Sequence, residues 1–331
     1  MDSAEGPRAT RASAVRAMDL LALGTPVIDL TARATDARLA RLSLKKGSTN
    51  FVTARRLSAI ERSIGKEIIH RYPGDNARNV CEGFASLGGS CGFLGAVGRD
   101  KEGEQFCKNL KEKGIANLTV KAKGKTGKII VLITPDGERT FCADLGVSTG
   151  FGRFDRNAIS AARMFFATSI TLAEKGEVGK LAMNYLRAFK KSGKKIALSL
   201  ESPLMVAKKR RFLLSALEKY ADFIFMNEEE ARALLGAGAE GKLARLKPSA
   251  LVFLKRGRRG SSVFAKSGRR DAPAIRARAI DSTGAGDAYV AGALYGISRG
   301  YSARMGTKFG SLLGAKVVGK IGAGIPPLRT G

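Results

Sequence analysis

Stretches with helical spacing of apolar residues alternate with short apolar runs along most of the chain. VCEGFASLG precedes CGFLGAVG, GEQFCKNLKEKG precedes LTVKA, KLAMNYLRAFKKSG precedes KIALSL, RRFLLSALEKYA precedes DFIFMN, and LARLKP precedes ALVFLKRG. Repeated alternation of helix and strand predicts an α/β fold: a doubly wound, mostly parallel sheet with helices on both faces. Ligands of such sheets bind at the carboxyl ends of the strands.

Two regions depart from this alternation. Residues 38–72 include β-rich stretches, and the segment TGKIIVLITPDGERTFCADLG (126–146) has the pattern of two strands joined by an Asp-Gly turn. We therefore expect a small β-sheet beside the main domain, formed by residues 30–75 and 118–147 and acting as a lid. The run DLLALGTPVIDLTAR predicts a buried first strand with the carboxylate of Asp29 at its exit.

The stretch AIDSTGAGDAYVAGALYGI (279–297) places two glycines and an Asp at a boundary between elements. The period-two pattern of residues 274–280 predicts a strand, and the residues after Asp287 have helical spacing, so the glycines lie in a strand-to-helix turn. The first amides of a helix lack intrahelical partners, so the amides of Gly284, Ala285, Gly286 and Asp287 are expected to bind a phosphate.

A carboxylate at a phosphate site needs a reason, because it repels the anion. Asp287 would have a function there if it took the proton from a hydroxyl that attacks the phosphate. The alternative is an ordinary helix cap, in which Asp287 or Ser282 accepts a backbone hydrogen bond. The turn considered alone leaves both interpretations open.

Composition narrows the function classes. The chain has 331 residues with 44% hydrophobic residues and no apolar run long enough to cross a bilayer, so we expect a soluble cytoplasmic protein, monomeric or homodimeric. Four Cys without a C-x-x-C pair, and one His, argue against a zinc site or a Cys–His nucleophile. The first residues, 1–18, lack an apolar signal core and are expected to form a disordered tail before a domain spanning 19–331.

Net charge is the anomaly of the composition. There are 58 Lys and Arg against 29 Asp and Glu, which gives a formal charge of +29. Such an excess raises affinity for anions in general and is one signature of nucleic-acid binding. The basic residues are scattered in short groups with few aromatics among them, which favours a solvated basic surface with weak, non-specific polyanion binding.

Six motifs occur in an order typical of one enzyme family. DSTGAGDAY and FMNEEEARALLG, together with GTPVIDL, PGDNARN, TPDGERT and KIGAG, resemble the ribokinase-like (PfkB-type) carbohydrate kinases, and more closely their adenosine-kinase-like branch. The resemblance covers residues 20–326. It implies a ribokinase-like domain with a β-sheet lid that transfers the γ-phosphoryl group of ATP, with Mg²⁺, to a hydroxymethyl group of a nucleoside or sugar.

The resemblance also implies roles for individual residues. The catalytic group comprises Asp287 as general base and the amides of Gly284, Ala285, Gly286 and Asp287 as anion hole. The nucleotide and metal group comprises Asn227, Gly257, Gly260 and Ser311 near the nucleotide, Glu230 near Mg²⁺ through water, and Asp281 near a monovalent cation such as K⁺. The substrate group comprises Asp29, Gly74, Asn79 and Arg139, and Asp75 is added to it from its own position in this chain rather than from the resemblance. Each has a structural alternative: a turn former at Asp29, a helix cap at Asn227 and Glu230, a polar helix residue at Asn79, hairpin surface at Arg139.

The chain also departs from the family pattern. Asp75 follows Gly74 where the family has two glycines, and Asn76 and Arg78 stand where it has small residues. Arg78 and Asn79 point about 100° apart on a helix, which leaves Arg78 free to face the lid or solvent, whereas Asp75 is expected to add a hydroxyl-accepting carboxylate near Asp29.

Two further positions differ, and one rival function stays open. Ser311 stands near a frequent Asn of the family, and Ser202 stands where the family has an acidic residue. The rival is a non-catalytic nucleic-acid- or polyanion-binding protein on the same scaffold. Retention of Asp287, its glycine turn and Glu230 together favours the enzyme.

Overall fold

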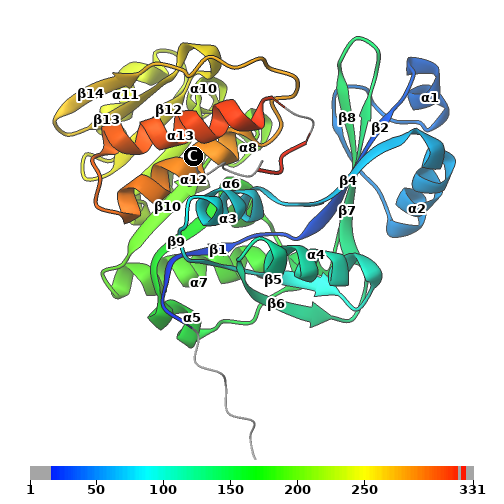
Figure 1. Cartoon of the computed structure of the whole chain (residues 1–331), viewed down its shortest axis with the longest axis horizontal. Helices are drawn as coiled ribbons and strands as arrows, with labels where there is room; N and C mark the ends of the chain where they lie inside the picture. Colours follow the sequence, from blue (N-terminus) through cyan, green and yellow to red (C-terminus); the bar gives the residue numbers. More distant parts are fainter. Residues whose placement is uncertain (1–15, 320–321, 326–331) are drawn as a thin grey trace, which may run out of the picture.

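The computed structural model describes residues 16–319 and 322–325, and they form two sheets flanked by helices (Figure 1). The larger sheet has nine strands in the order β14-β13-β12-β11-β10-β9-β1-β5-β6. Its pairings from β6 to β12 are parallel, and only β13 and β14 add antiparallel edges, which confirms the predicted doubly wound α/β class. The strand bounds are β1 (Met18–Leu23), β5 (Cys91–Gly98), β6 (Ala116–Ala122), β9 (Ala162–Thr168), β10 (Lys195–Ser199), β11 (Phe223–Asn227), β12 (Leu251–Lys255), β13 (Ser261–Ala265) and β14 (Gly268–Ala272).

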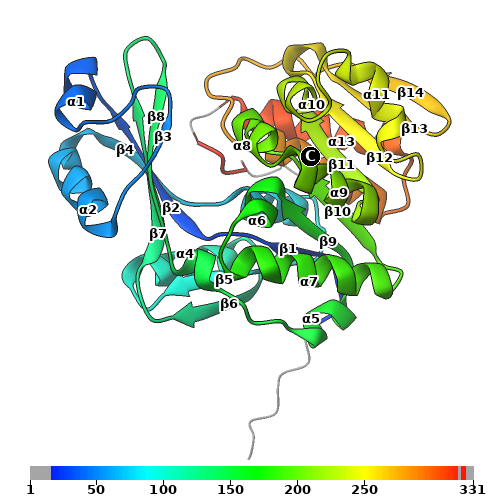
Figure 2. The same cartoon turned by 180° about the vertical axis from the view of Figure 1, so that it is seen from behind.

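Helices cover both faces of this sheet, and each face has its own hydrophobic core. The face seen in Figure 1 carries α3 (Asn76–Ser86), α4 (Lys101–Glu112), α12 (Ala285–Ser298) and α13 (Ala303–Val317). The opposite face, seen in Figure 2, carries α5 (Arg156–Ala161), α6 (Ser169–Ala173), α7 (Glu177–Lys191), α8 (Pro203–Lys208), α9 (Arg210–Tyr220), α10 (Glu228–Leu235) and α11 (Ala239–Leu246). Strands between two helical layers are buried on both sides, which explains continuous apolar runs such as β5. No helix in the described ranges has the length and apolar content to span a membrane.

The smaller sheet stands beside the larger one and has the order β3-β8-β7-β2-β4. Its strands are β2 (Val27–Arg33), β3 (Thr49–Phe51), β4 (Ile68–Gly74), β7 (Thr126–Ile133) and β8 (Arg139–Gly146). Two helices, α1 (Asp36–Arg41) and α2 (Ala54–Ser63), contribute Leu39, Leu57 and Ile60 to the core beneath it. The hairpin predicted around the Asp-Gly turn is β7–β8, paired antiparallel.

Several predicted boundaries are wrong. Residues 118–122 belong to β6 of the larger sheet, so this part of the predicted lid range is excluded, and the smaller sheet instead begins at Val27. The predicted first strand is two strands, and Asp29 lies inside β2 rather than at the exit of β1. Residues 274–280 form no strand. Most of the predicted tail lies outside the described residues, and β1 begins at Met18.

The chain crosses between the two sheets at points that bring polar groups together. It leaves β1 and enters β2 through Gly24, Thr25 and Pro26, and it returns from β4 into α3 at Gly74 and Asp75. The parallel strands β1, β9, β10, β11 and β12 all have their carboxyl ends at the same edge. The junction of this edge with the smaller sheet is the expected place for a ligand.

Candidate functional site

The turn before α12 presents unpaired amides and a buried carboxylate. Gly284 is the N-cap with φ +76, and no side chain caps the helix, so the alternative of Asp287 or Ser282 as an N-cap is not realised. A Cβ at Gly284 would lie 2.5 Å from Cβ of Ala323, which requires glycine there. Within the described residues, the amides of Gly286 and Asp287 donate to no acceptor. The turn therefore offers two free N–H groups at the positive end of a helix.

Asp287 is 4% exposed and lies among groups from several elements. Asn79 Nδ2 donates to its Oδ2 at 2.9 Å, and Asn76 Nδ2 lies 3.3 Å from its Oδ1. Burial and the nearby Glu201 together raise the pKa of Asp287 to about 8, although Asn79, Lys255 and Asn76 act in the opposite direction. A carboxyl with this pKa exchanges a proton near neutral pH, as a general base must.

Lys255 and Glu201 belong to this cluster and were missed by the sequence analysis. Lys255 ends β12, and its Nζ lies 3.2 Å from where a Cβ on Gly286 would be. No carboxylate of the described chain lies within 4 Å of Nζ. Glu201 follows β10, accepts from Ser199 at 2.9 Å and has a pKa raised by burial. Their positions at strand carboxyl ends were the available signal.

Glu201 places an acidic side chain one position before Ser202. Ser202 caps α8, with its hydroxyl accepting from the amide of Met205 at 3.4 Å. Burial raises the pKa of Glu201, and the charge of the nearby Lys255 acts in the opposite direction. Ser202 itself caps a helix, and the acidic side chain that this segment contributes to the cluster is Glu201.

Asn227 and Glu230 form a reciprocal capping box at the start of α10. The amide of Glu230 donates to Asn227 Oδ1 at 2.8 Å, and the Glu230 carboxylate accepts from Asn227 N at 2.8 Å and Nδ2 at 3.0 Å. Glu230 is 3% exposed, and burial raises its pKa to about 7 although Lys255 opposes the shift. The described residues contain no group of three or more His, Cys, Asp or Glu side chains placed to hold a metal ion directly.

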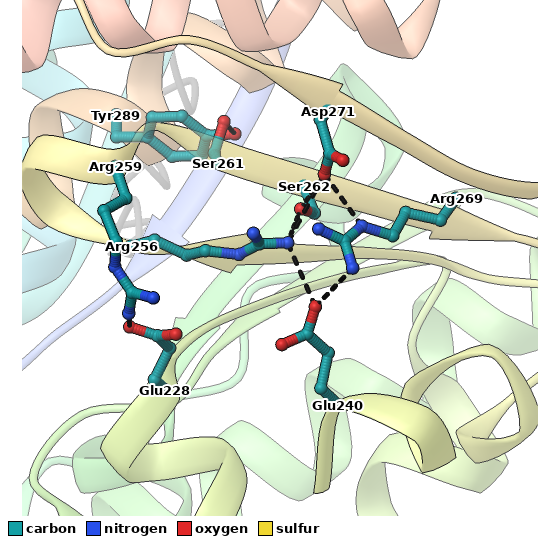
Figure 3. Close-up of polar contacts among 9 residues, drawn as sticks. All are labelled: Glu228, Glu240, Arg256, Arg259, Ser261, Ser262, Arg269, Asp271 and Tyr289. Atoms are coloured by element: carbon teal, nitrogen blue, oxygen red, sulfur yellow. Dashed lines mark hydrogen bonds and ion pairs between the residues drawn. The ribbon is translucent and has the colours of Figure 1, made fainter.

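An arginine network fixes the turn that contains Gly257 and Gly260 (Figure 3). The Arg256 guanidinium donates to the Ser262 hydroxyl and to the carboxylates of Glu240, at 3.1 Å, and Asp271, at 3.3 Å. The Arg269 guanidinium donates to the same two carboxylates. These contacts tie the turn to α11, β13 and β14, while Arg259 pairs with Glu228 at the start of α10 and Tyr289 bonds Ser261. A Cβ at Gly260 would lie 2.1 Å from Ala272 O, so this glycine is required by packing, whereas Gly257 faces open space.

Asp29 and Asp75 are neighbouring carboxylates with different surroundings. Asp75 is the N-cap of α3 and accepts from Thr25 N at 2.8 Å, Thr25 Oγ1 at 3.3 Å and Arg78 N at 2.8 Å. No donor of the described chain bonds Asp29, whose pKa rises to about 7 because of burial and repulsion from Asp75, with Arg78 opposing. The Asp29 carboxylate thus has unused acceptor positions, whereas the Asp75 carboxylate already accepts hydrogen bonds from Thr25 and Arg78.

Arg78 does not face solvent, so that part of the expectation is wrong, but it does contact Tyr72 of β4, a strand of the smaller sheet. Its side chain is fully buried and pairs with Glu82 at 2.7 Å. It also donates to Tyr72 Oη at 3.1 Å, Asn109 Oδ1 at 2.5 Å and Asn79 Oδ1 at 3.1 Å. Helical periodicity gave the angle between Arg78 and Asn79 but not the presence of acceptors inside the core.

Arg139, at the start of β8, pairs with Asp281 in the segment that leads into α12. Arg139 Nη2 lies 2.5 Å from Asp281 Oδ1, and its Nη1 donates to Thr283 Oγ1. Asp281 Oδ2 accepts from Gly322 N at 3.0 Å. Burial alone would raise the pKa of Asp281, but bonds from Gly322, Thr283 and Arg139 outweigh it and lower the pKa to about 2. The Asp281 carboxylate, expected near a monovalent cation, is thus paired with the Arg139 guanidinium.

Ser311 lies on α13, beside the segment that leads into the glycine turn. It is half-buried, and no other described residue bonds its side chain. The next residue, Leu312, is 38% exposed, and Ile280 is 60% exposed. The amide of Ile280 donates to Val318 O at the end of α13, so the two segments are adjacent.

Comparisons with known proteins identify the family and related structures. A model of the pfkB family carbohydrate kinases matches residues 44–330. Adenosine kinase of Saccharomyces cerevisiae is 25% identical over 93% of this chain and 96% of its own length, and fructokinase of Klebsiella pneumoniae is 29% identical over 71% and 80%. The crystal structure of adenosine kinase from Sinorhizobium meliloti superposes with a TM-score of 0.84 at 26% identity, covering 94% of this chain and 96% of that one.

Proposed function

We propose that this chain, which belongs to the pfkB family of carbohydrate kinases, transfers the γ-phosphoryl group of ATP to a hydroxymethyl group of a nucleoside such as adenosine, or of a free sugar. The observation that carries the proposal is the buried Asp287 beside the amides of Gly286 and Asp287, which bond no acceptor in the described part of the chain. The rival, a non-catalytic polyanion-binding protein, receives no support from the relatives, which are named as kinases.

In the proposed reaction Asp287 accepts the proton of the attacking hydroxyl. Its ionised form is favoured by the amide of Asn79 at 2.9 Å and by the charge of Lys255. The Lys255 ammonium lies beside Gly286, and together with the amides of Gly286 and Asp287 it is proposed to hold the negative charge of the transferred phosphoryl group. Fixed donors aimed at developing charge are a large source of catalysis, because they need no reorganisation during the reaction.

The acceptor substrate is proposed to lie between the two sheets, with the smaller sheet as its lid. Asp29 supports this placement because no donor among the residues that the structure describes bonds its carboxylate, which is free to accept hydroxyl hydrogen bonds. Gly74 leaves room for that carboxylate, and Asn79 lies beside the base. Arg139 is proposed to act from the lid by holding the loop at Asp281, rather than by contacting substrate directly.

The nucleotide is proposed to lie along the carboxyl ends of β11 and β12. The turn from Gly257 to Gly260 and the region of Ser311 flank this space, and the uncovered Ile280 and Leu312 offer apolar surface for a base. The donor set fits Mg²⁺ held through water by Glu230 and Asn227, since carboxylate and amide oxygens are the ligands that this ion prefers. When bound, Mg²⁺ neutralises phosphate charge.

A coupled assay of ATP consumption over a panel of nucleosides and free sugars tests the proposal. We expect saturable turnover with one class of acceptor, adenosine being the first candidate because both adenosine kinases cover more than nine tenths of the chain. The Asp287→Asn variant is the control, since it keeps the shape of the site. Equal turnover by the parent and this variant, or no turnover with any acceptor, would contradict the proposal.

A further inference from the structure

Arg78 is a fully buried cation whose four partners come from three elements. Glu82 and Asn79 lie on its own helix α3, Tyr72 lies on β4 and Asn109 lies on α4. A buried charge persists only when it is paired and hydrogen-bonded, and here the pairing is supplied by Glu82 at 2.7 Å. The guanidinium is therefore held in one position by Glu82, Tyr72 and Asn109, which lie outside the catalytic cluster.

The contact with Asn79 connects this anchor to the proposed base. Arg78 Nη1 lies 3.1 Å from Asn79 Oδ1, while Asn79 Nδ2 lies 2.9 Å from Asp287 Oδ2. A guanidinium can only donate, so it accepts nothing from an amide NH₂ group. The oxygen of Asn79 must then face Arg78, which leaves its NH₂ group facing Asp287. Rotation of the Asn79 amide by 180° would place two donors together and an oxygen against the carboxylate.

We propose that Arg78 is a positioning residue that locks the Asn79 amide with its NH₂ group toward Asp287. The effect is to keep a donor on the carboxylate and so to favour its ionised form. The catalytic consequence rests on the proposed function, but the orientation itself does not. Arg78 suits this role better than lysine would, because its planar fork serves Glu82, Asn109 and Asn79 at once from a fixed plane.

Other groups also act on Asp287 and must stay constant in a test. The charged groups that face it are Glu201 after β10 and Lys255 at the end of β12, and Asn76 adds a weaker amide contact from α3. Arg78→Lys keeps the positive charge in the core but cannot serve all the acceptors of the fork. Tyr72→Phe is the matched control, because it removes a contact of Arg78 at 3.1 Å while leaving the bond to Asn79.

The experiment measures the Asp287 carboxyl directly in the full chain. Carboxyl ¹³C NMR titration, with the Asp287 signal assigned from its loss in Asp287→Asn, gives its pKa without any turnover. We expect Arg78→Lys to raise this pKa by about one unit, since a lost donor to the charged form disfavours that form. Tyr72→Phe should leave it nearly unchanged. If the proposed function holds, the acidic limb of the kcat/KM profile moves upward in Arg78→Lys alone.

Two outcomes would overturn the inference. One is an Asp287 pKa that is the same in Arg78→Lys and in the parent, and the other is an equal shift in Arg78→Lys and Tyr72→Phe. Absence of turnover by the parent would count against the proposed function, while the NMR result would still decide the role of Arg78. If Arg78→Lys does not fold, Arg78→Met with Glu82→Leu removes both charges of the buried pair and serves in the same titration.

Discussion

The carboxylate of Asp29 lies directly over Gly74, where a Cβ would come within 2.0 Å of Oδ2. The two residues belong to the antiparallel neighbours β2 and β4, close to where the chain enters β2 from β1 and leaves β4 for α3. The missing side chain at position 74 therefore makes the space that Asp29 occupies. Asp75 is next in the chain, yet its oxygens accept from Thr25 and Arg78.

This difference between the two carboxylates predicts different substitution effects. Asp29→Asn should raise the KM for the acceptor about tenfold or more, because a hydrogen bond to a charged group is lost, with the KM for ATP nearly unchanged. Asp75→Asn, which retains an N-cap oxygen, should change the acceptor KM less than about threefold. Steady-state kinetics of the pair measure both effects. The reverse ranking would restore Asp75 as the substrate carboxylate.

Replacement of the base should affect the chemical step. Asp287→Asn should lower kcat by at least about two orders of magnitude, since a general base contributes about 10²–10⁴ in rate, while ATP binding is largely kept. In the parent, the acidic limb of kcat/KM should fall near the pKa of about 8 given to Asp287 by burial. Steady-state rates from pH 5 to 9 and nucleotide titration calorimetry check the prediction, and a kcat near that of the parent would remove Asp287 from this role.

Burial of Asp287 should also appear in the stability of the fold. The ordinary pKa of an Asp carboxyl is 3.8, whereas the pKa of Asp287 in the folded protein is about 8, so the folded state binds more protons between these values. The free energy of unfolding should therefore fall as pH rises through this window. Asp287→Asn should flatten that fall and, at pH 8, be more stable than the parent by an amount on the order of 2 kcal/mol. Urea unfolding at pH 5 and pH 8 measures it, and identical slopes with pH would refute it.

Removal of the Lys255 ammonium should weaken the electrostatic stabilisation of the transferred phosphoryl group. Lys255→Met takes away the ammonium beside Gly286 and should lower kcat/KM for ATP about tenfold or more. Lys266→Met removes the same charge from an exposed position and should leave kcat/KM nearly unchanged. This control separates a local effect from a change in net charge. Equal losses in both variants would mean that Lys255 acts only through the overall field.

The contact between Arg139 and Asp281 should couple the lid to the glycine turn. Arg139→Met and Asp281→Asn, combined in a double-mutant cycle on kcat/KM, should show a coupling energy of about 1 kcal/mol, because the pair is partly buried and hydrogen-bonded. Additive effects would show that the two residues act independently.

Replacing K⁺ by a large organic cation should change kcat less than about twofold, because the Asp281 carboxylate is already paired with the Arg139 guanidinium.

Local patterns were sufficient for much of the fold. Helical and strand periodicity depends on neighbouring residues, so the alternating elements, the β7–β8 hairpin and the turn before α12 lie where the sequence predicted them. The exception at residues 274–280 is instructive. A strand needs a partner edge, and β13 pairs instead with β14 at residues 268–272, so the alternating pattern of 274–280 remains outside the sheet.

Contacts between distant residues were decided by the tertiary structure. Asn79 and Asp287 are 208 positions apart, and only the packing of α3 against α12 brings them to 2.9 Å. Period and turn chemistry could not show that Arg78 finds acceptors inside the core, nor that Lys255 ends beside Gly286. The sequence by itself determined which elements form and where the glycine turn lies, because these depend on short-range sterics and hydrogen bonding. The order of strands and the points of crossing between sheets determined which side chains meet, because such contacts depend on the packing of the whole chain.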